Sequence, residues 1–495
     1  MHKELTKTHQ KYSDSEIINI VVDNFMALAR IPRPSHHEEK VSRYLTDWAV
    51  DRGFKAFRDS FNNVRIDVPA TEGMENLPTT VLQAHMDMVV AVEKGKDFDP
   101  ISDPITVIRN DDDGILTADG TSLGADDGSG IALAKAVAEG KMNHGPLRII
   151  LTADEEDGLE GAFNLSADWL EGTSYLINLD TEDPDEVLVS TASGHAVRVK
   201  KQLAFEDPSG NLAVHVRLYN LKGGHSGMEI DKGRLNSIQG MACFLKELER
   251  EGIDCQLASF EGGHVGNAIP SSADAVLVIP SEEKEKLTQT LAAYVDSLNV
   301  KYAGIEDDIQ YTITEMAELP LVVAMEEKNH LIKFVSEIID GVYTWSPDIE
   351  GLVESSSNLG VASVNPDGLS MLTNIRSSSP EKETEILEAQ LALAEACGYE
   401  TESSHMADAW PFDPDSKLLA LTKKIYKEQN GKDIRVAALH VGLECGTFKR
   451  LKPELDLISI GPDQRDIHST KETLYLNSIP KVWHLLEGIL AEINR

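Results

Sequence analysis

Two helices are predicted at the start of the chain from their capping signals and apolar spacing. Residues 13–16 (Ser-Asp-Ser-Glu) have the spacing of a capping box, in which the two outer residues satisfy each other's backbone N–H groups, and predict a helix through Ala29. Residues 35–38 (Ser-His-His-Glu) have the same spacing. The helix after them carries its apolar residues on one face and is expected to stop at Gly53.

Short apolar runs of strand length follow these helices. They occupy residues 79–82, 147–151 and 175–179, with a fourth run at 457–460. A helical pattern over residues 131–139, ended by Gly140, lies between the first two runs. Strands that alternate with helices predict an α/β domain, with a mostly parallel central sheet flanked by helices.

Polar side chains with metal-binding chemistry lie just after these runs. His85 follows the first run, Glu155 and Glu156 follow the second, Asp180 follows the third, and the loop after the fourth contains His468. Ligands of open α/β sheets bind at the carboxyl ends of the strands. The pattern therefore predicts that these side chains gather at one edge of the sheet.

The pattern changes near Gly194, which indicates a second, inserted domain. Apolar and polar residues alternate around position 216, as in a half-exposed strand, and amphipathic helices are expected over residues 237–251 and 283–298. We therefore assign residues 195–403 to the inserted domain. The first domain would comprise residues 1–194 and 404–495, the latter including a helix over 417–429.

The composition is typical of an intracellular globular protein. A length of 495 residues suggests two domains. The net charge of −37 argues against nucleic acids and anionic membranes as partners. The N-terminus lacks the apolar segment of a secretory signal, and no run of 18 apolar residues exists, so we expect a cytoplasmic location. The four cysteines form no C-x-x-C pair, which makes a thiolate zinc site unexpected.

Each motif, taken singly, also has a plain structural explanation. His85-Met-Asp87 places two side chains on one side of a strand, where Asp87 could orient the imidazole, but a strand-end histidine beside a solvated aspartate has the same sequence. Asp126, in Leu-Gly-Ala-Asp-Asp-Gly, could bridge two metal ions or belong to a tight turn. Adjacent Glu155 and Glu156 repel unless a cation or proton relieves them, so one could bind metal while the other takes a proton. Taken together, these residues suit a two-metal hydrolase.

The middle region contains one further candidate. His225 lies in Gly-Gly-His-Ser-Gly, where the glycines let it project from a turn. A histidine in that position could stabilise a developing oxyanion. An exposed histidine in an ordinary glycine turn is the alternative.

Eight segments in this chain, in this order, resemble the co-catalytic zinc family of cytosolic dipeptidases, tripeptidases and aminoacylases. Within that family the likeness is to the bacterial aminoacyl-histidine dipeptidases. The segments are residues 31–35 (IPRPS), 83–88 (QAHMDM), 123–128 (LGADDG), 152–156 (TADEE), 178–180 (NLD), 223–227 (GGHSG), 440–446 (HVGLECG) and 461–468. The resemblance implies a catalytic α/β domain interrupted by an α+β lid domain, through which the protein would form a homodimer.

The same resemblance assigns metal ligands. His85, Asp126 and Asp180 would bind one divalent ion, and Asp126, Glu156 and His468 would bind a second. Zinc is the expected metal, with cobalt or manganese as alternatives, since sites of this kind accept several metals.

Other residues would act around the metals. Glu155 would be the general base for a metal-bridged water, and Asp87 would orient His85. The peptide bond between Asp126 and Asp127 is expected to be cis. Many relatives carry a different residue at position 127, so the extra carboxylate could alter metal affinity or point away. From the lid, His225 would reach the substrate, in its own or the partner subunit's site, and Asn267 and Arg376 would hold the substrate's C-terminal carboxylate.

The reaction implied is metal-dependent hydrolysis of unblocked dipeptides, preferably Xaa-His, including β-alanyl-histidine. An N-acyl-amino-acid amidohydrolase with the same metals is one alternative. A catalytically inactive relative that only binds ligands is another.

Overall fold

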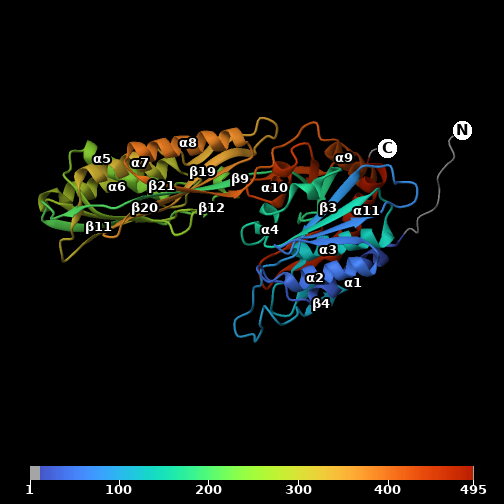
Figure 1. Ribbon diagram of the computed structural model, residues 1–495. Coiled ribbons are helices and arrows are strands. Elements are labelled where there is room, and N and C mark those ends of the chain that lie inside the picture. Colours follow the sequence, from blue (N-terminus) through green and yellow to red (C-terminus); the bar gives the residue numbers. More distant parts are fainter. Residues whose placement is uncertain (1–11, 494–495) are drawn as a thin grey trace. The chain divides into compact units, whose positions relative to one another are not determined.

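The computed structural model describes residues 12–493, which form two compact units (Figure 1). The first unit contains the chain up to Ser190, Trp410–Ala438 and the chain from Leu443 onward. The second contains Thr191–Ala409 and the short return Leu439–Gly442. The chain therefore passes between units after residues 190 and 409, whereas the sequence pattern suggested divisions after 194 and 403, and the short return was not expected.

An eight-stranded mixed sheet forms the centre of the first unit. Its strand order is β1-β2-β6-β3-β7-β23-β8-β22. The strands are β1 (Lys55–Arg58), β2 (Val64–Val68), β3 (Thr79–His85), β6 (Leu147–Thr152), β7 (Thr173–Asn178), β8 (Glu186–Thr191), β22 (Arg435–Leu439) and β23 (Asp456–Ser459). The four neighbours β6, β3, β7 and β23 run parallel, whereas β1, β2 and β8 pair antiparallel. The predicted parallel sheet is therefore confirmed for the central strands, with antiparallel pairing toward the edges.

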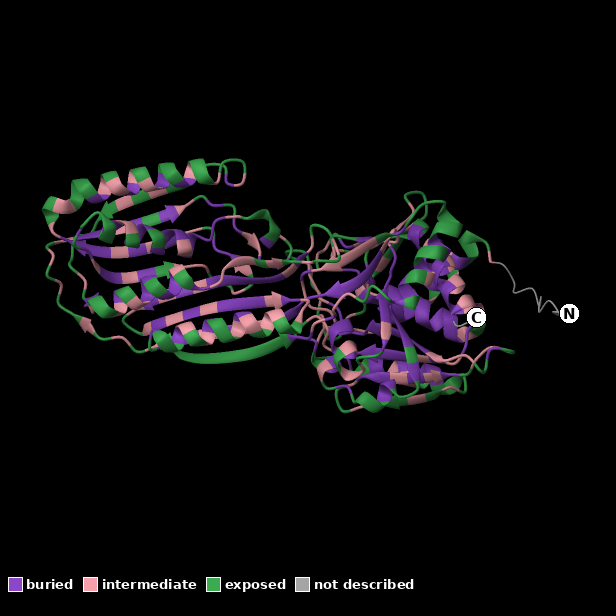
Figure 2. Ribbon diagram, turned by 90° about the horizontal axis from the view of Figure 1, so that it is seen from above, coloured by how far each residue is buried: buried purple, intermediate pink, exposed green. Residues whose placement is uncertain are grey.

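Helices pack against this sheet and against one another. They are α1 (Asp14–Ala29), α2 (Glu39–Asp51), α3 (Ala125–Ala136), α4 (Glu160–Phe163), α9 (Lys417–Asn430), α10 (Glu444–Leu451) and α11 (Ile479–Glu492). Helix α3 packs on β3 and on α1, α1 contacts α11, and α11 contacts α9. Six of the seven residues of β3 are buried, as expected for a central strand covered on both faces. Figure 2 shows this contrast between the buried strands and the exposed outer faces of the helices.

The two predicted capping boxes have different outcomes. Ser13 caps α1 as expected: its side chain accepts from the Glu16 N–H, and the Glu16 carboxylate accepts from the Ser13 N–H. The second prediction was wrong, because α2 begins at Glu39 after Glu38 and has no side-chain cap. Ser35 instead donates to the Asp87 carboxylate at 2.8 Å, and Glu38 accepts from the backbone N–H groups of His36 and Asp154. Both members of the motif are thus used by longer-range contacts.

A short antiparallel sheet adjoins the C-terminal loop of the first unit. It has the order β24-β25-β5-β4 and consists of β4 (Val107–Asn110), β5 (Ile115–Ala118), β24 (Gln464–Arg465) and β25 (Thr473–Tyr475). Strands β4 and β5 form a hairpin whose turn contains the exposed run of residues 111–113. These three aspartates are exposed to solvent.

The second unit is built on a nine-stranded sheet whose recorded pairings are all antiparallel. Its order is β16-β11-β15-β13-β19-β20-β9-β21, with β18 paired to β19. The strands are β9 (Ser193–Lys201), β11 (Leu212–Tyr219), β13 (Gln256–Gly262), β15 (Ala273–Ile279), β16 (Gln310–Glu315), β18 (Gly341–Trp345), β19 (Val353–Asn365), β20 (Gly368–Ser377) and β21 (Glu400–Ala407). Two further pairs are β10 (Phe205–Glu206) with β17 (Val322–Val323), and β12 (Gly224–His225) with β14 (Ala268–Ile269).

Four helices bury the core of this second sheet. They are α5 (Ser237–Arg250), α6 (Lys284–Lys301), α7 (Met325–Glu337) and α8 (Pro380–Ala396). Their apolar residues, such as Phe244, Leu291, Phe334 and Ile386, join the inward-facing side chains of the strands in one hydrophobic cluster. The predicted helices over residues 237–251 and 283–298 are confirmed within a few residues, and the unit is α+β.

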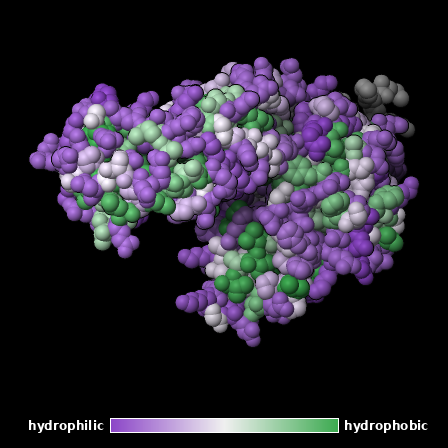
Figure 3. All heavy atoms as spheres, turned by 60° about the vertical axis from the view of Figure 1, so that its left-hand side comes forward, coloured by the Kyte–Doolittle hydropathy of each residue, from purple (hydrophilic) through white to green (hydrophobic). Residues whose placement is uncertain are grey.

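The surface carries mainly hydrophilic side chains. Hydrophilic side chains cover most of the face seen in Figure 3. Among residues 12–493, no helix combines the length and the apolar character needed to cross a membrane.

Candidate active site

The carboxyl ends of the parallel strands bring the predicted residues together. Strand β3 ends at His85, which lies opposite Thr152 at the end of β6, and Glu155 and Glu156 follow three and four residues later. Strand β7 ends at Asn178, opposite Gln83 on β3, and Asp180 follows it. Each strand therefore delivers its polar residues to the same edge of the sheet.

Two groups of three possible metal ligands share Asp126. One group is His85, Asp126 and Asp180, and the other is Asp126, Glu156 and His468; within each, the ligand atoms lie within 4.8 Å of one another. The Asp126 Oδ1 atom lies 2.9 Å from Nε2 of His85, and its Oδ2 lies 3.1 Å from Nε2 of His468. The two oxygens of one carboxylate thus face two different groups, which is the arrangement that a bridging ligand requires.

The backbone around Asp126 has the predicted unusual geometry. The peptide bond between Asp126 and Asp127 is cis. The Asp127 side chain is fully buried and accepts hydrogen bonds from the backbone N–H groups of Gly130, at 3.0 Å, and His85, at 3.3 Å. This carboxylate is therefore directed to the backbone, and it belongs to neither ligand group.

Two buried charged side chains hold the loop that contains Asp126. The Glu472 carboxylate accepts from the backbone N–H groups of Leu123, Gly124 and Ala125 at 2.7 to 2.9 Å. The Arg33 guanidinium donates to the carbonyl groups of Met86, Asp87 and Gly124. Gly124 has a φ of 72°, and a Cβ there would lie 2.6 Å from the Met88 sulfur, so the loop passes too close for a side chain.

Asp87 connects His85 with the two glutamates. It is fully buried, and its two oxygens accept from the backbone N–H groups of Glu155, at 3.0 Å, and Glu156, at 3.2 Å. Its Oδ1 also lies 3.5 Å from Nδ1 of His85, on the side of the ring opposite Asp126. Asp87 thus fixes the backbone of the glutamate pair and faces the ring nitrogen that would not bind a metal.

The site crowds carboxylates into a buried space, which changes their acidity. Burial, together with repulsion from Asp126, raises the pKa of Asp180 to about 8, and burial raises the pKa of Glu155 well above its usual value. Burial opposes ionisation of Asp126 too, but hydrogen bonds from His468 and His85 lower its pKa. Hydrogen bonds to Asp126 and Glu156 raise the pKa of His468 to about 10. This excess of negative charge favours positive ions.

The donor set fits divalent metals. Imidazole nitrogens and carboxylate oxygens are the usual zinc ligands, and three or four of them around each ion are sufficient. Among the described residues, the buried Oε1 atom of Glu156 has no hydrogen-bond partner, although a buried carboxylate oxygen is normally satisfied. A metal ion between Glu156, Asp126 and His468 would satisfy it.

Sequence reasoning missed a buried polar network beneath the site. Glu444 accepts from the Gln83 amide at 2.6 Å and from the Thr152 hydroxyl at 2.7 Å, and burial raises its pKa to about 7. The Gln83 carbonyl accepts from the Asn178 amide at 2.6 Å, and Asn178 in turn accepts from the Ser459 hydroxyl. The sequence did contain a signal for this network, because Gln, Thr, Asn and Ser interrupt strand segments that are otherwise apolar. Arg33 and Glu472 were likewise not identified as supports of the site.

In the second unit, local contacts determine the protonation state and the tautomer of His225. The residue lies on β12 beside Ala268 of β14. Its Nδ1 accepts from the backbone N–H groups of Gly227 and Met228, both at 3.1 Å. Burial and the nearby Arg376 lower its pKa. His225 is therefore neutral at neutral pH and has its hydrogen on Nε2, which makes that atom a donor.

The other two predicted substrate residues also lie in the second unit. Arg376 is on β20, between Ser356 of β19 and Gly194 of β9, and its pKa is lowered by burial alone. Among the described residues, its Nε atom is buried without a hydrogen-bond partner. Asn267 is exposed just before β14, and its carbonyl accepts from the Ser226 N–H. Sequence reasoning did not single out His440, which is buried beside Arg376 and hydrogen-bonds the Ser356 hydroxyl.

A model described as peptidase family M20/M25/M40 matches residues 81–492. The chain belongs to this family. It is 34% identical over 473 residues to the cytosol non-specific dipeptidase of Escherichia coli, a match that covers 95% of this chain and 97% of that protein. The resemblance seen in the sequence motifs is thus confirmed.

Solved structures of other peptidases share the fold of this M20 family member. The aminoacylhistidine dipeptidase of Vibrio alginolyticus is 34% identical, with a TM-score of 0.91 over 96% of this chain and 97% of that chain. The aminopeptidase PepT of Bacillus cereus, at 17% identity, has a TM-score of 0.54 over 97% of this chain and 99% of that chain, and shows the fold alone. The predicted class, a catalytic α/β domain with an inserted α+β lid, is confirmed.

The shared position of Asp126 predicts unequal losses of metal from single variants. Compared with the wild type, Asp126→Ala should bind two divalent metal ions fewer per chain, because both ligand groups include Asp126, whereas His468→Ala should bind one fewer. Elemental analysis after dialysis at limiting zinc measures both. Asp112→Asn, in the exposed β4–β5 turn, is the control and should lose none. Equal losses from Asp126→Ala and His468→Ala would contradict a bridging role.

Proposed function

We propose that this M20 peptidase is a dipeptidase that hydrolyses unblocked dipeptides with two divalent metal ions, of which zinc is the expected species. The observation that carries the proposal is the pair of ligand groups that share Asp126, with the partly buried carboxylate of Glu155 beside them. His85, Asp126 and Asp180 would hold one ion, and Asp126, Glu156 and His468 the other. When bound, such ions polarise a carbonyl group and acidify water at neutral pH.

Glu155 is assigned the proton transfer. It lies next to the ligand Glu156, its backbone is fixed by Asp87, and burial raises its affinity for a proton. A carboxyl group with a raised pKa can accept the proton of the attacking water and later give it to the leaving amine. Asp87 lies beside Nδ1 of His85, the ring nitrogen that faces away from Asp126, and is assigned a positioning role.

The second unit is assigned the recognition of the substrate. His225 presents Nε2–H as a donor, which suits a developing oxyanion. Arg376 is a largely buried cation, and a carboxylate of the substrate would give it bidentate hydrogen bonds. Asn267 is the third residue assigned to contact the substrate. It is exposed and directly precedes β14, the strand that pairs with the His225 strand β12.

The proposal includes a homodimer formed through the second unit and a cytoplasmic location. Strand β16 is an edge of the nine-stranded sheet, and an open edge is a common place for association. The exposed apolar side chains of Met316, Leu319 and Leu321 follow that strand. For the compartment, the support is the E. coli relative, which is described as a cytosol dipeptidase.

Substrate choice is tested with a panel of peptides. The purified protein should cleave unblocked dipeptides, lose this activity to a chelator, and regain it with zinc. We expect β-alanyl-histidine and other Xaa-His dipeptides to be the best substrates, as the sequence resemblance implies. Similar rates for all unblocked dipeptides would keep the dipeptidase assignment and remove the histidine preference. Cleavage of N-acetylated amino acids only would replace the assignment with an amidohydrolase.

The role of Glu155 predicts a variant that binds metal but turns over slowly. Glu155→Gln keeps the size of the side chain and removes its capacity to accept a proton. We expect kcat to fall by about 10²–10⁴-fold, the usual contribution of general acid–base catalysis, while the zinc content matches that of the wild type. Steady-state kinetics and elemental analysis measure the two quantities. A near-normal kcat would show that another group takes the proton.

The role of Arg376 predicts a loss that depends on the substrate's C-terminus. Arg376→Met should raise KM for dipeptides with a free carboxylate by about 10–100-fold, since hydrogen bonds to a charged group contribute about 1.5–3 kcal/mol. The amides of the same dipeptides should be affected little. Arg217→Met, at an exposed arginine of β11, is the matched control. An equal effect on acids and amides would contradict the assignment.

A further inference from the structure

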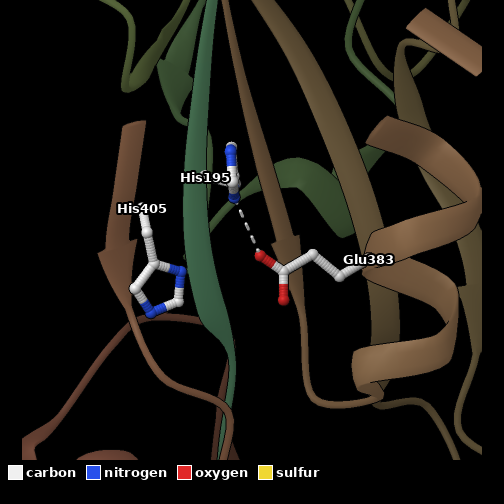
Figure 4. A group of neighbouring side chains, drawn as sticks. All are labelled: His195, Glu383 and His405. Carbon is white, nitrogen blue, oxygen red and sulfur yellow. Dashed lines mark ion pairs between the residues drawn. The ribbon is translucent and has the colours of Figure 1, made fainter. Parts of the chain in front are cut away.

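A second cluster of metal-binding side chains lies within the second unit, apart from the groups around Asp126. It consists of His195 on β9, Glu383 on α8 and His405 on β21, and one ligand atom from each lies within 4.8 Å of the others. Figure 4 shows the two imidazoles on neighbouring strands, with the Glu383 carboxylate approaching His195 from the helix. Neither the proposed reaction nor substrate recognition uses these residues.

The fold places the three side chains on the same face of the sheet. His195 and His405 are directly opposite in the antiparallel pairing of β9 with β21, so their Cβ atoms are neighbours on one side. Val197 and Val199, which alternate with the same period as His195, belong to the core cluster together with Ile386 of α8. His195 therefore faces the helix that carries Glu383.

The separation between His195 and Glu383 suits a shared ion better than a direct contact. Nδ1 of His195 lies 3.4 Å from Oε1 of Glu383, whereas hydrogen bonds between charged nitrogen and oxygen atoms are usually about 2.7–2.9 Å long. Two ligands that each lie about 2.0–2.1 Å from a tetrahedral zinc ion are separated by about 3.3–3.4 Å. The two atoms thus already have the spacing of two ligands of one ion.

Asp408 gives His405 the tautomer that a metal ligand needs. Its Oδ1 lies 3.0 Å from Nε2 of His405, and Asp408 is almost fully buried. A histidine that donates one ring N–H to a carboxylate presents the other nitrogen as an acceptor, which is the usual support for a metal-bound imidazole. In Figure 4 that other nitrogen of His405 is directed toward His195 and Glu383. The pairing is also irregular between His405 and Ala407, as at a β-bulge, and bulges are frequent beside functional sites.

We propose that His195, Glu383 and His405 form a further zinc site in the second unit, with Asp408 as the positioning residue for His405. Two imidazoles and one carboxylate are an established zinc ligand set, and water completes the tetrahedron. The ion connects three elements: β9, the first strand after the chain enters this unit at Thr191; β21, the last before it leaves at Ala409; and α8. Its role is structural, because it ties the edge strand β21 to the helix and to the neighbouring strand.

An ordinary histidine–carboxylate pair is the competing explanation. The same unit contains an example: Nε2 of His215 lies 2.8 Å from Oδ1 of Asp274 on a neighbouring strand, and within residues 12–493 the pair belongs to no group of three possible metal ligands. His215→Ala is therefore a matched control for the loss of one partly exposed histidine. His405→Ala is the main test variant, since this side chain is 44% exposed and its removal should not disturb the core.

The experiment measures zinc binding to the full-length protein. Zinc is added to the metal-free chain by equilibrium dialysis, and bound zinc is counted by elemental analysis, with dipeptidase activity assayed in parallel. We expect His405→Ala and Glu383→Gln to bind one zinc fewer than the wild type and to keep wild-type turnover. The His215→Ala control should bind the wild-type number. Asp408→Asn should keep the site but weaken its affinity by about 10–100-fold, as loss of such a supporting carboxylate typically does.

The outcomes separate this site from the one around Asp126. Equal zinc content in the wild type, His405→Ala and Glu383→Gln would overturn the further site and leave the proposed function untouched. Loss of turnover together with loss of one zinc would mean that the missing ion belongs to the catalytic centre, which would also overturn the proposal. Circular dichroism of each variant confirms that any change in zinc content occurs in a folded chain.

Discussion

Negative charge is concentrated at the carboxyl ends of the central strands, and the arrangement of the first unit around its site depends on compensating that charge. Asp126, Glu155, Glu156 and Asp180 converge in a mostly buried space, with two imidazoles as their nearest neutral or positive partners. Buried carboxylates repel one another and lose the solvation that water provides, so such a group is unfavourable without protons or cations. The raised pKa values of Glu155 and Asp180 are the sign of that constraint.

The surrounding structure holds these groups in place through backbone contacts. Glu472 and Arg33 both act on the backbone of the loop that contains Asp126, and Glu472 also accepts from the Asp126 N–H at 3.4 Å. Asp87 works in the same way on the backbone of Glu155 and Glu156. Rigid support of this kind keeps ligand positions fixed when charges change, and it explains why charged residues that bind nothing themselves are buried around the site.

Structural elements and site residues could be predicted from the sequence where a local pattern is compatible with only one structure. Apolar runs of strand length predicted the four parallel strands, and the residues after them supplied candidate metal ligands other than Asp126, because strand direction alone decides where the carboxyl end lies. The predicted capping box at Ser35 was wrong, because a serine hydroxyl can hydrogen-bond a carboxylate far along the chain as well as a helix end. Only the fold brings Asp87 close enough for that bond. Glu444 and Glu472 could not be found from local pattern, since their partners are 292 to 361 and 346 to 349 positions away along the chain.

The buried row of Thr152, Gln83, Asn178 and Ser459 has a consequence for folding. These four polar residues lie on β6, β3, β7 and β23, the strands that run parallel, and hydrogen-bond one another from strand to strand. A slip of one residue in any of these strands would turn its side chain to the opposite face and leave an amide or hydroxyl buried without a partner. The row therefore fixes the relative alignment of the four strands: β3 and β6 end together at His85 and Thr152, and β7 and β23 end together at Asn178 and Ser459, level with Gln83.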